Sequence, residues 1–348
     1  MRRICCYPQG VKNVIFMWIK LLLSTGGKIV NKLLTFIHGI KDHYAHGYQH
    51  SYPQGKVMVN QTNNNSHGVL MNVCRYGLLG KKISYALSPA IHNRWFIKRG
   101  IAAVFDLLDV SCYEHAVLDR AWSLGYRGIC VTVPYKTQVM RYPGLVLDCV
   151  AQSVGAANVL RYDGADKQGC PIVCATNTDA QALDDALHMC SVSGAVGVVL
   201  GAGGAAMATL WALRQHGIGR IVLAVRDTKK VEALCSAGGI HADAIISIET
   251  LSDVHADIFV NATTLGRGGE LPPIPKGASL VVDWVYRPSA VNNSALPEVA
   301  IGGDFFPIRT QPTPLIQKAK QQGILTIDGE SLLLGQARRA FSFWFECF

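Results

Sequence analysis

Short apolar runs alternate with segments of helical spacing along most of the chain. "AVFDLLDV" (103–110) and "GICVTVP" (128–134) have the apolar, β-branched character of buried strands. Between them, "CYEHAVLDRAWSLG" (112–125) places apolar residues at helical spacing and ends on a glycine. Because strands and helices alternate, this region predicts a mostly parallel sheet with crossover helices.

A second series of the same kind begins at Gly197. The run Val198–Leu200 predicts a buried strand, and 205–216 predicts a helix that ends before a glycine. Further strands are expected in "RIVLAVRD" (220–227) and in the segments that follow. Units of strand, helix and strand in series are typical of a nucleotide-binding domain. The fold class predicted is therefore α/β, with two domains and a cleft between them.

The turn between the first strand and helix of this second series carries a glycine pattern. Gly201, Gly203 and Ala206 fit G-x-G-x-x-G/A after a strand and before a helix. Gly201 permits a tight turn, and Gly203 lets the backbone approach a pyrophosphate at the helix N-terminus. The predicted dinucleotide contacts are Gly201, Ala202, Gly203, Gly204 and Ala205.

Charged residues at the end of the next strand bear on the choice of cofactor. Arg226 directly follows that strand, with Lys230 nearby, and basic residues here accept the 2′-phosphate of NADP. Asp227 would instead bind the ribose hydroxyl of NAD. Each of these charges could also belong to a solvated turn. We expect NADP because of the position of Arg226, and Asp227 leaves NAD open.

Composition and charge narrow the class of protein. The 348 residues are 49% hydrophobic and 16% charged, as in a globular chain of two domains. The net charge of +9 lies mainly in residues 1–70, which hold eight lysines and arginines and one acid. The remainder is nearly neutral, so no nucleic-acid partner is expected. The eleven cysteines form no CxxC pair and no zinc set, which predicts a reduced, cytoplasmic protein without a metal.

Residues 1–70 differ from the rest of the chain. They are basic and partly apolar, and their longest apolar run, 14–23, is interrupted by Lys20. This run is shorter than the ~20 residues that a membrane-spanning helix needs, so no stable membrane span is expected. We predict an N-terminal extension followed by a polar linker, and its basic character leaves organelle targeting open. The sequence is compatible with a monomer or a homodimer.

Two ionisable residues are candidates for proton transfer beside a nicotinamide. Lys136 comes just past a predicted strand, and Asp179 follows another short strand-like segment in "CATNTDAQAL" (174–183). An amine in a cleft can act as an acid or base, and a carboxylate can orient it. The alternatives are a solvated lysine and a helix N-cap. Spacing alone assigns neither residue.

From about Tyr76 to Trp344 the chain resembles the shikimate dehydrogenase family, including shikimate/quinate dehydrogenases. The resemblance rests on several motifs in the family's order: "ISYALSPAIHN", "GICVTVPYK", "VGAANVL", "TNTDA", "LGAGGAA", "NATTLG", "DWVYRP", "TPLIQKAKQQG" and "DGESLLLGQARRAF". It implies a reversible NADP-linked reduction of the 3-keto group of 3-dehydroshikimate, a step of aromatic amino acid biosynthesis. The only expected partner is this small-molecule substrate.

The resemblance also implies roles for individual residues. Lys136 would be the acid/base, paired with Asp179. The residues implied to contact substrate are Ser88, Thr132, Asn158, Tyr286 and Gln336, and those implied to line the nicotinamide side are Asn261 and Thr263. The implied domains are a substrate domain at 71–178, completed by about 311–348, and a Rossmann-type NADP domain at 179–310.

Several positions depart from the family's pattern. Ala86 stands where a serine usually helps to hold the substrate carboxylate, and Cys130 replaces an asparagine. Ala180 replaces a glycine, Arg267 a methionine, and 289–312 is longer than usual. Fewer polar partners for the substrate would weaken shikimate binding. Arg267 could compensate by binding the carboxylate, and the alternative is a solvated arginine. A dehydrogenase for quinate or a shikimate analogue, or a non-catalytic metabolite-binding paralogue, therefore remain alternatives.

Overall fold

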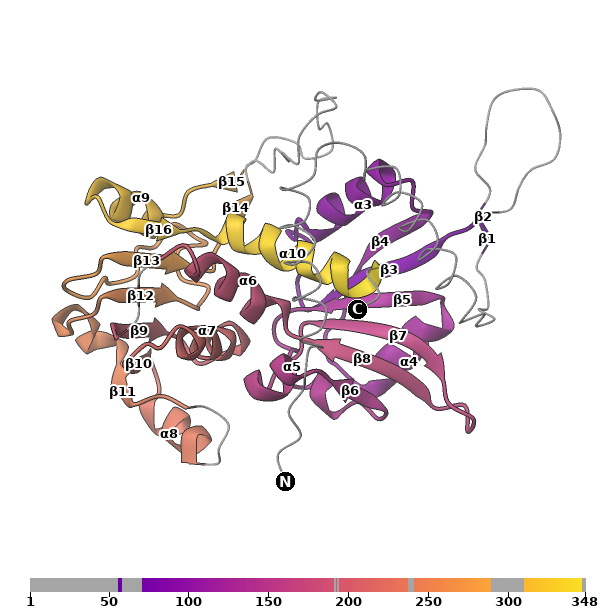
Figure 1. Ribbon diagram of the computed structural model, residues 1–348, viewed down its shortest axis with the longest axis horizontal. Helices are drawn as coiled ribbons and strands as arrows, with labels where there is room; N and C mark the ends of the chain where they lie inside the picture. The colour runs from indigo at the N-terminus through magenta and orange to yellow at the C-terminus, as the bar shows by residue number, and fades with distance from the viewer. Residues whose placement is uncertain are drawn as a thin grey trace, which may run out of the picture. The chain divides into compact units, whose positions relative to one another are not determined.

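The computed structural model describes residues 56–57, 71–190, 192, 194–236, 241–288 and 310–345. Most of the expected N-terminal extension and of the 289–312 stretch lies outside the described residues. Within 1–70 the structure describes β1 (Lys56–Val57), which pairs antiparallel with β2 (Met71–Asn72). Two six-stranded sheets and the helices around them make up most of the described fold (Figure 1).

The first sheet has the strand order β4-β3-β5-β7-β8-β6. Its strands are β3 (Cys74–Gly80), β4 (Ala103–Asp109), β5 (Tyr126–Val131), β6 (Leu145–Leu147), β7 (Val159–Ala165) and β8 (Pro171–Thr176). β3 runs parallel to β4 and β5, and β6 runs parallel to β8, but β7 is antiparallel to both of its neighbours. The sheet is therefore mixed. The short turn between β7 and β8 produces the reversal, because so short a connection cannot cross over to make a parallel pair.

The second sheet is parallel throughout and has the order β11-β10-β9-β12-β13-β16. Its strands are β9 (Val196–Leu200), β10 (Arg220–Val225), β11 (Ala244–Ser247), β12 (Ile258–Asn261), β13 (Leu280–Asp283) and β16 (Leu325–Ile327). Taken in chain order this is 3-2-1-4-5-6, the Rossmann arrangement. Strand order reverses between β9 and β12, and such a switch point opens a crevice at the carboxyl ends of the strands.

Helices connect the strands of both sheets. They are α3 (Ser88–Lys98), α4 (His115–Ser123), α5 (Cys149–Val154), α6 (Thr178–Leu187), α7 (Gly204–Gln215), α8 (Thr228–Ser236), α9 (Pro314–Gln321) and α10 (Gly329–Phe345), with 3-10 turns η1 (Val139–Arg141) and η2 (Ile248–Asp253). Both predicted series of strands and helices are present, and the predicted two-part α/β fold is confirmed. A further short ladder pairs β14 (Arg287–Pro288) with β15 (Thr310–Gln311).

Helix α10 contributes to the cores of both sheets (Figure 1). Near its start, Leu332 packs with the apolar residues around the second sheet, while Phe341 and Trp344 pack with those around the first. The Trp344 indole lies directly over Gly128 of β5, where an added Cβ would come within 2.4 Å of Nε1. That nitrogen donates a hydrogen bond to the Leu160 carbonyl at 3.0 Å. A side chain at 128 would therefore displace the end of this helix.

The segment 311–348, expected to complete the first domain, takes part in both sheets' packing. β16 joins the second sheet beside β13, whereas the end of α10 packs on the first. In the described part of the chain, no helix combines the length and the apolar character needed to cross a bilayer.

Candidate active site

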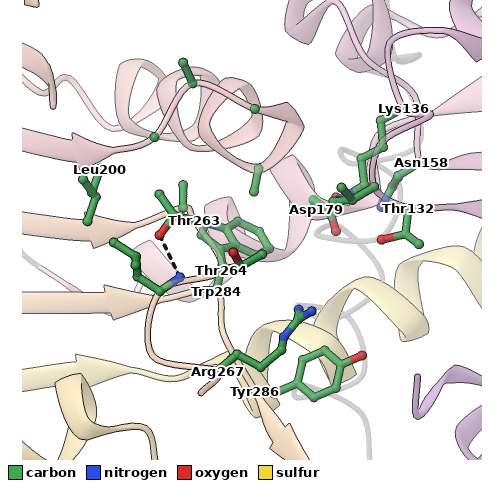
Figure 2. Close-up of a pocket in the computed structure, with 18 of the residues that line it drawn as sticks. Thr132, Lys136, Asn158, Asp179, Leu200, Thr263, Thr264, Arg267, Trp284 and Tyr286 are labelled. Carbon is green, nitrogen blue, oxygen red and sulfur yellow. Dashed lines mark hydrogen bonds and ion pairs between the residues drawn. The ribbon is translucent and has the colours of Figure 1, made fainter. Parts of the chain in front are cut away.

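A cavity of about 650 Å³ is lined by residues of both sheets and of α10 (Figure 2). From the first sheet come residues that follow the carboxyl end of β5, including Thr132 and Lys136. From the second come residues that follow β9, β10 and β12, among them Gly203, Arg226 and Thr263. Ligands of open α/β sheets bind outside the carboxyl ends of the strands. This cavity is therefore the candidate site.

Lys136 and Asp179 form an ion pair on the wall of this cavity (Figure 2). Lys136 Nζ donates to Asp179 Oδ2. The two side chains are only 13% and 8% exposed, so little water screens their charges. The structure thus brings together the two residues that the resemblance paired and that spacing alone could not assign, and the alternative of a fully solvated lysine does not fit this burial.

The N-terminus of α6 fixes the position of Asp179. Asn177 is the N-cap, because its side chain accepts a hydrogen bond from the Ala180 N–H at 3.0 Å. Asn177 is itself held by a hydrogen bond from Nδ2 to the Ala156 carbonyl at 2.8 Å. The alternative that Asp179 is the N-cap is therefore wrong. Asp179 lies in the first turn of the helix, where the helix dipole is favourable to a negative charge.

The residues expected to contact substrate all line the cavity: Ser88, Thr132, Asn158, Tyr286 and Gln336. Ser88 is 5% exposed, and its hydroxyl makes no hydrogen bond within the described residues. Asn158 is held by Thr178, whose backbone N–H donates to Asn158 Oδ1 at 2.7 Å and whose hydroxyl accepts from Nδ2 at 3.0 Å. One N–H of the Asn158 amide is left for a ligand.

Cys130 also lines the cavity, at the position where the family has an asparagine. Its side chain is buried, and this burial raises the pKa of the thiol well above its usual range. A neutral thiol is a weak hydrogen-bond donor. This part of the wall therefore offers a ligand less polar contact than an amide would.

The glycine turn after β9 has the features that a dinucleotide needs. Gly201 has φ +113°, and a Cβ there would lie 2.9 Å from Thr263 Cγ2, so the backbone itself requires glycine. Gly203 has an ordinary φ of −91°, and an added Cβ would meet no atom of the described residues within 4 Å. The space beside Gly203, which lies directly before α7, is thus open to a ligand. The residues present fit a pyrophosphate at this helix N-terminus.

Two predicted cofactor residues do not line the cavity. Gly204 lies against Lys136 instead, because a Cβ added at Gly204 would come within 3.1 Å of Lys136 Cδ. Asn261 is fully buried, and its Nδ2 donates to the Leu265 carbonyl and to Asp283 Oδ1, both at 2.9 Å. Its Oδ1 accepts from the Thr263 hydroxyl at 2.7 Å. Asn261 thus shapes the loop after β12, and Thr263 lines the cavity from that loop.

The charged residues after β10 lie at the same cavity. Arg226, Asp227 and Lys230 all line it. Asp227 Oδ1 accepts a hydrogen bond from the Lys230 backbone N–H at 3.0 Å, and the Asp227 carbonyl accepts from Val231. This carboxylate therefore stabilises the first turn of α8. The arrangement gives Asp227 a structural role that the sequence did not reveal.

Other lining residues were not among the predicted site residues. Trp284 lines the cavity, and its Nε1 donates to Thr209 Oγ1 of α7 at 2.9 Å. Tyr85 and Thr264 also line it. Each stands inside a motif that carries the resemblance, "ISYALSP", "NATTLG" or "DWVYRP", and this is the signal by which they could have been found.

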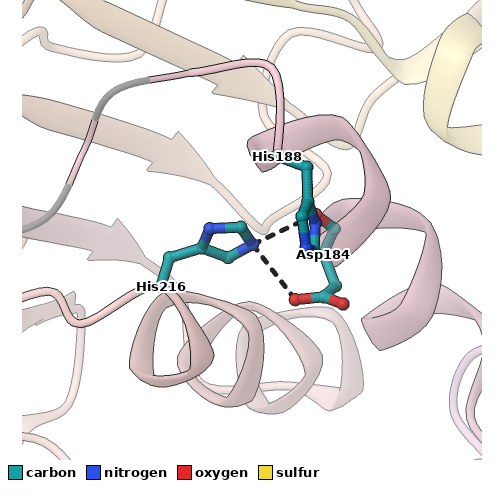
Figure 3. A group of neighbouring side chains, drawn as sticks. All are labelled: Asp184, His188 and His216. Carbon is teal, nitrogen blue, oxygen red and sulfur yellow. Dashed lines mark hydrogen bonds and ion pairs between the residues drawn. The ribbon is translucent and has the colours of Figure 1, made fainter.

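A second group of polar side chains joins the ends of α6 and α7 (Figure 3). Asp184, His188 and His216 offer three possible metal-ligating atoms within 4.8 Å of one another. However, His188 Nδ1 and His216 Nε2 lie 2.7 and 3.1 Å from the Asp184 carbonyl, and His216 Nε2 also lies 3.1 Å from Asp184 Oδ1. These hydrogen bonds explain the cluster, because they join the C-terminal ends of α6 and α7. The expectation that the protein holds no metal stays a prediction.

Comparison with known proteins agrees with the geometry. Residues 78–160 match the family model described as the shikimate dehydrogenase substrate binding domain. The chain is 32% identical to a shikimate dehydrogenase (NADP(+)) of Bartonella quintana over 290 residues, covering 77% of this chain and 86% of that one.

Solved structures of the family share the fold. A shikimate dehydrogenase of Peptoclostridium difficile is 27% identical with a TM-score of 0.61, covering 79% of this chain and 92% of that one. A shikimate 5-dehydrogenase of Thermus thermophilus, solved with NADP(H) and shikimate, is 25% identical with a TM-score of 0.60, covering 79% and 94%. An Ael1 enzyme of Pseudomonas putida is 26% identical with a TM-score of 0.59, covering 79% and 94%.

The two sheets, the cavity between them and these similarities agree with the resemblance seen in the sequence, and the chain belongs to the shikimate dehydrogenase family of oxidoreductases.

Proposed function

We propose that this chain is an NADP-dependent shikimate dehydrogenase, which interconverts the 3-hydroxyl of shikimate and the 3-keto group of 3-dehydroshikimate. The observation that carries the proposal is the Lys136–Asp179 ion pair in a cavity that also reaches Gly203 and Arg226. The same cavity is thus lined by a residue that can carry a proton and by a glycine turn that fits a dinucleotide. Residues 71–178 with 311–348 would form the substrate domain, and residues 179–310 the nucleotide domain.

Lys136 would move the proton of the reaction. A nicotinamide cofactor held at Gly203 and Arg226 would supply the hydride for reduction and accept it for oxidation. In reduction, the Nζ ammonium gives a proton to the keto oxygen as the hydroxyl forms, and solvent then reprotonates the amine. In oxidation, the neutral amine takes the hydroxyl proton. Asp179 would hold Nζ in place and balance its charge.

The other lining residues would orient the substrate ring. Asn158 can use its remaining amide N–H, and Thr132 and Gln336 lie on the same cavity wall. Ser88 offers a hydroxyl with no protein partner in the described part of the chain. Because Thr178 fixes Asn158 from behind, its amide is pre-organised and loses little freedom when the substrate binds.

Preference for NADP is supported by the charges after β10. Arg226 and Lys230 present two cations to the cavity. The neighbouring acid in this turn, Asp227, already accepts a hydrogen bond from the first turn of α8. Arginine binds phosphate through parallel N–H donors, so Arg226 suits a 2′-phosphate better than a ribose hydroxyl.

A matrix of cofactors and substrates tests the proposal. The purified chain is mixed with NADP⁺ or NAD⁺ and with shikimate or quinate, and absorbance at ~340 nm reports the reduced nicotinamide. We expect turnover with shikimate and NADP⁺, and Arg226→Ala should reduce the preference for NADP⁺ over NAD⁺ by ~10-fold or more. No turnover of shikimate with either cofactor, at high enzyme concentration, would reject the proposal.

A dehydrogenase for a related cyclic hydroxy acid is the second candidate. Cys130 favours it, because this buried thiol lies on the cavity wall where the family has an amide. The same matrix separates the two: a higher kcat/KM for quinate or an amino-substituted analogue than for shikimate supports the second candidate. Binding of shikimate without turnover of any of these acids would instead indicate a metabolite-binding paralogue.

A further inference from the structure

Arg267 is a cation on the cavity wall for which the described residues hold no acidic partner. It lies in the loop after β12 and lines the cavity together with Lys136, Ser88 and Tyr286. None of the ion pairs of the described residues includes it. Its neighbour Glu270 accepts instead from the Gly266 N–H at 3.2 Å. A guanidinium in a ligand cavity is suited to an anionic ligand group when no carboxylate neutralises it.

The loop that carries Arg267 is fixed by hydrogen bonds from buried groups. Asn261 Nδ2 holds the Leu265 carbonyl at 2.9 Å, and the Leu265 N–H donates to Thr263 Oγ1 at 3.1 Å. Gly266 has φ +97°, which turns the chain back, and the Arg267 N–H donates to the Thr264 carbonyl at 3.2 Å. The base of the arginine is thus set by the end of β12.

Aromatic rings fix the other end of the side chain. Arg267 Cζ lies 4.3 Å from the centroid of the Tyr85 ring, a cation–π contact. The Tyr85 and Tyr286 ring centroids are 6.5 Å apart, and Figure 2 shows the Arg267 side chain next to Tyr286. Both tyrosines line the cavity. Arg267 and Tyr85 are both exposed, so this contact orients the guanidinium at the cavity wall without removing it from solvent.

The same cavity is lined by the Ser88 hydroxyl, which has no hydrogen-bond partner among the described residues. Tyr85, which stacks against Arg267, lies three residues before Ser88 and directly before Ala86. Ser88 is 5% exposed and begins α3, whose first turn holds no acid. The resemblance implies a serine at position 86, where this chain has Ala86, which packs against the apolar core of the first sheet. A ligand carboxylate at this place would find one hydroxyl instead of two, with a guanidinium beside it.

We infer that Arg267 binds the substrate carboxylate together with Ser88, and that it replaces the donor lost at Ala86. This inference rests on the proposed function, because it assigns the carboxylate end of a ring whose hydroxyl is at Lys136. The guanidinium would donate charge-assisted hydrogen bonds to the carboxylate, and such bonds are stronger than one from a second neutral hydroxyl. The site thus selects for substrates that carry a carboxylate.

Variants of Arg267 test this with two substrates, shikimate and its uncharged methyl ester. We expect Arg267→Met to raise KM and the Kd from calorimetry for shikimate by about 10- to 100-fold, with kcat changed less than threefold. The methyl ester should bind both proteins equally, and KM for NADP⁺ should stay within twofold. Arg267→Lys should recover part of the loss, because it keeps the charge but not the paired donors.

A matched control and a rescue complete the test. Arg99 stacks on the Phe341 ring, with Cζ 4.6 Å from the centroid, but does not line the cavity. Arg99→Met should leave shikimate KM unchanged. Adding Ala86→Ser to Arg267→Met should restore shikimate binding at least threefold.

The outcomes distinguish the two proposals. If the wild type turns over shikimate but Arg267→Met binds acid and ester as the wild type does, the carboxylate role is wrong. An increase confined to the KM for NADP⁺ would instead place Arg267 at the cofactor. If the wild type binds shikimate tightly without turnover, the calorimetric comparison still decides the role of Arg267 while the dehydrogenase proposal fails. Absence of shikimate binding to the wild type overturns both.

Discussion

Lys136 and Asp179 are 43 residues apart in the chain, and their side chains form an ion pair in the cavity. Lys136 follows β5, and Asp179 lies in the first turn of α6, the helix that comes after β8. Neither strand is the other's neighbour, because β7 lies between them. The pair therefore depends on the correct assembly of the first sheet and ties its carboxyl ends together.

Removing either member of this pair should abolish most of the activity. We expect Lys136→Met to lower kcat for shikimate oxidation by ~10²- to 10⁴-fold, because it removes the proton carrier. Asp179→Asn should lower kcat by ~10²-fold, because the amide no longer balances the ammonium charge. Steady-state kinetics measures both, and NADP⁺ affinity by fluorescence titration should change less than threefold.

Two matched variants serve as controls for this prediction. Lys167 is exposed in the turn between β7 and β8, and Asp185 pairs with Arg339 at 2.5 Å on the same helix as Asp179. Lys167→Met and Asp185→Asn should retain wild-type kcat. Full activity in Lys136→Met would contradict the proton-carrier role.

The two glycines of the nucleotide turn should respond differently to alanine. At Gly203 a methyl group meets no atom of the described residues, so Gly203→Ala should keep the wild-type Tm and raise KM for NADP⁺ by ~10-fold or more through contact with the cofactor. At Gly201 the backbone has φ +113°, so Gly201→Ala should lower stability by about 1–3 kcal/mol. Scanning calorimetry and cofactor titration measure the two effects. A fall in Tm without a change in KM for Gly203→Ala would contradict the open space assigned to the cofactor.

His92 should make the fold sensitive to acid. Its ring is fully buried against Phe105 at a centroid distance of 4.5 Å, and neither ring nitrogen has a hydrogen-bond partner among the described residues. Burial lowers the pKa of His92 to about 3 from 6.5. The unfolded chain therefore binds this proton first as pH falls, so stability is full above pH ~6.5 and declines from there toward pH ~3.

Substitution of His92 tests this linkage. At pH ~5 the effect corresponds to about 2 kcal/mol. We expect His92→Leu to lose less stability than the wild type between pH ~7 and ~5, as measured by urea unfolding. The exposed His241 provides the control, since His241→Leu should keep the wild-type dependence. Parallel pH curves for His92→Leu and wild type would show that the ring protonates in the folded state.

Asp283 should make the fold less stable as pH rises, which is the opposite of the effect expected of His92. It is fully buried at the end of β13 and accepts from Thr313 Oγ1 at 2.5 Å, Asn261 Nδ2 at 2.9 Å and the Val285 N–H at 3.0 Å. Burial raises the pKa of Asp283 to about 6 from 3.8 despite these donors. The folded state thus holds this proton more tightly, so the contribution is full below pH ~4 and is lost as pH rises through about 6.

The variant Asp283→Asn removes this titration. Because the shift is about two pKa units, the wild type should lose about 2 kcal/mol from this group between pH ~4 and ~7, and the variant should not. Unfolding in urea at several pH values measures the difference. Equal slopes in both proteins would mean that the carboxylate ionises as readily in the fold as in the unfolded chain.

The sequence determined the order of elements and the places where chemistry could occur. Alternating apolar runs predicted strands in both sheets, among them β4, β5, β9 and β10 but not β6 or β7, and the glycine pattern at 201–206 predicted the nucleotide turn. These features are local, because strand burial and backbone freedom depend on a few neighbouring residues. The position of Lys136 beyond a strand end followed from the same local pattern.

Only the tertiary structure decided which side chains meet. Asn261 was expected at the cofactor but clamps a loop from within the core, and Asp227 was an argument for NAD but stabilises a helix end. The resemblance had implied that Lys136 pairs with Asp179, whereas the stacking of Arg267 on Tyr85 came from the structure alone. Both contacts join residues far apart in the chain. Such contacts depend on how distant strands and loops pack together, and no short window of sequence holds that information.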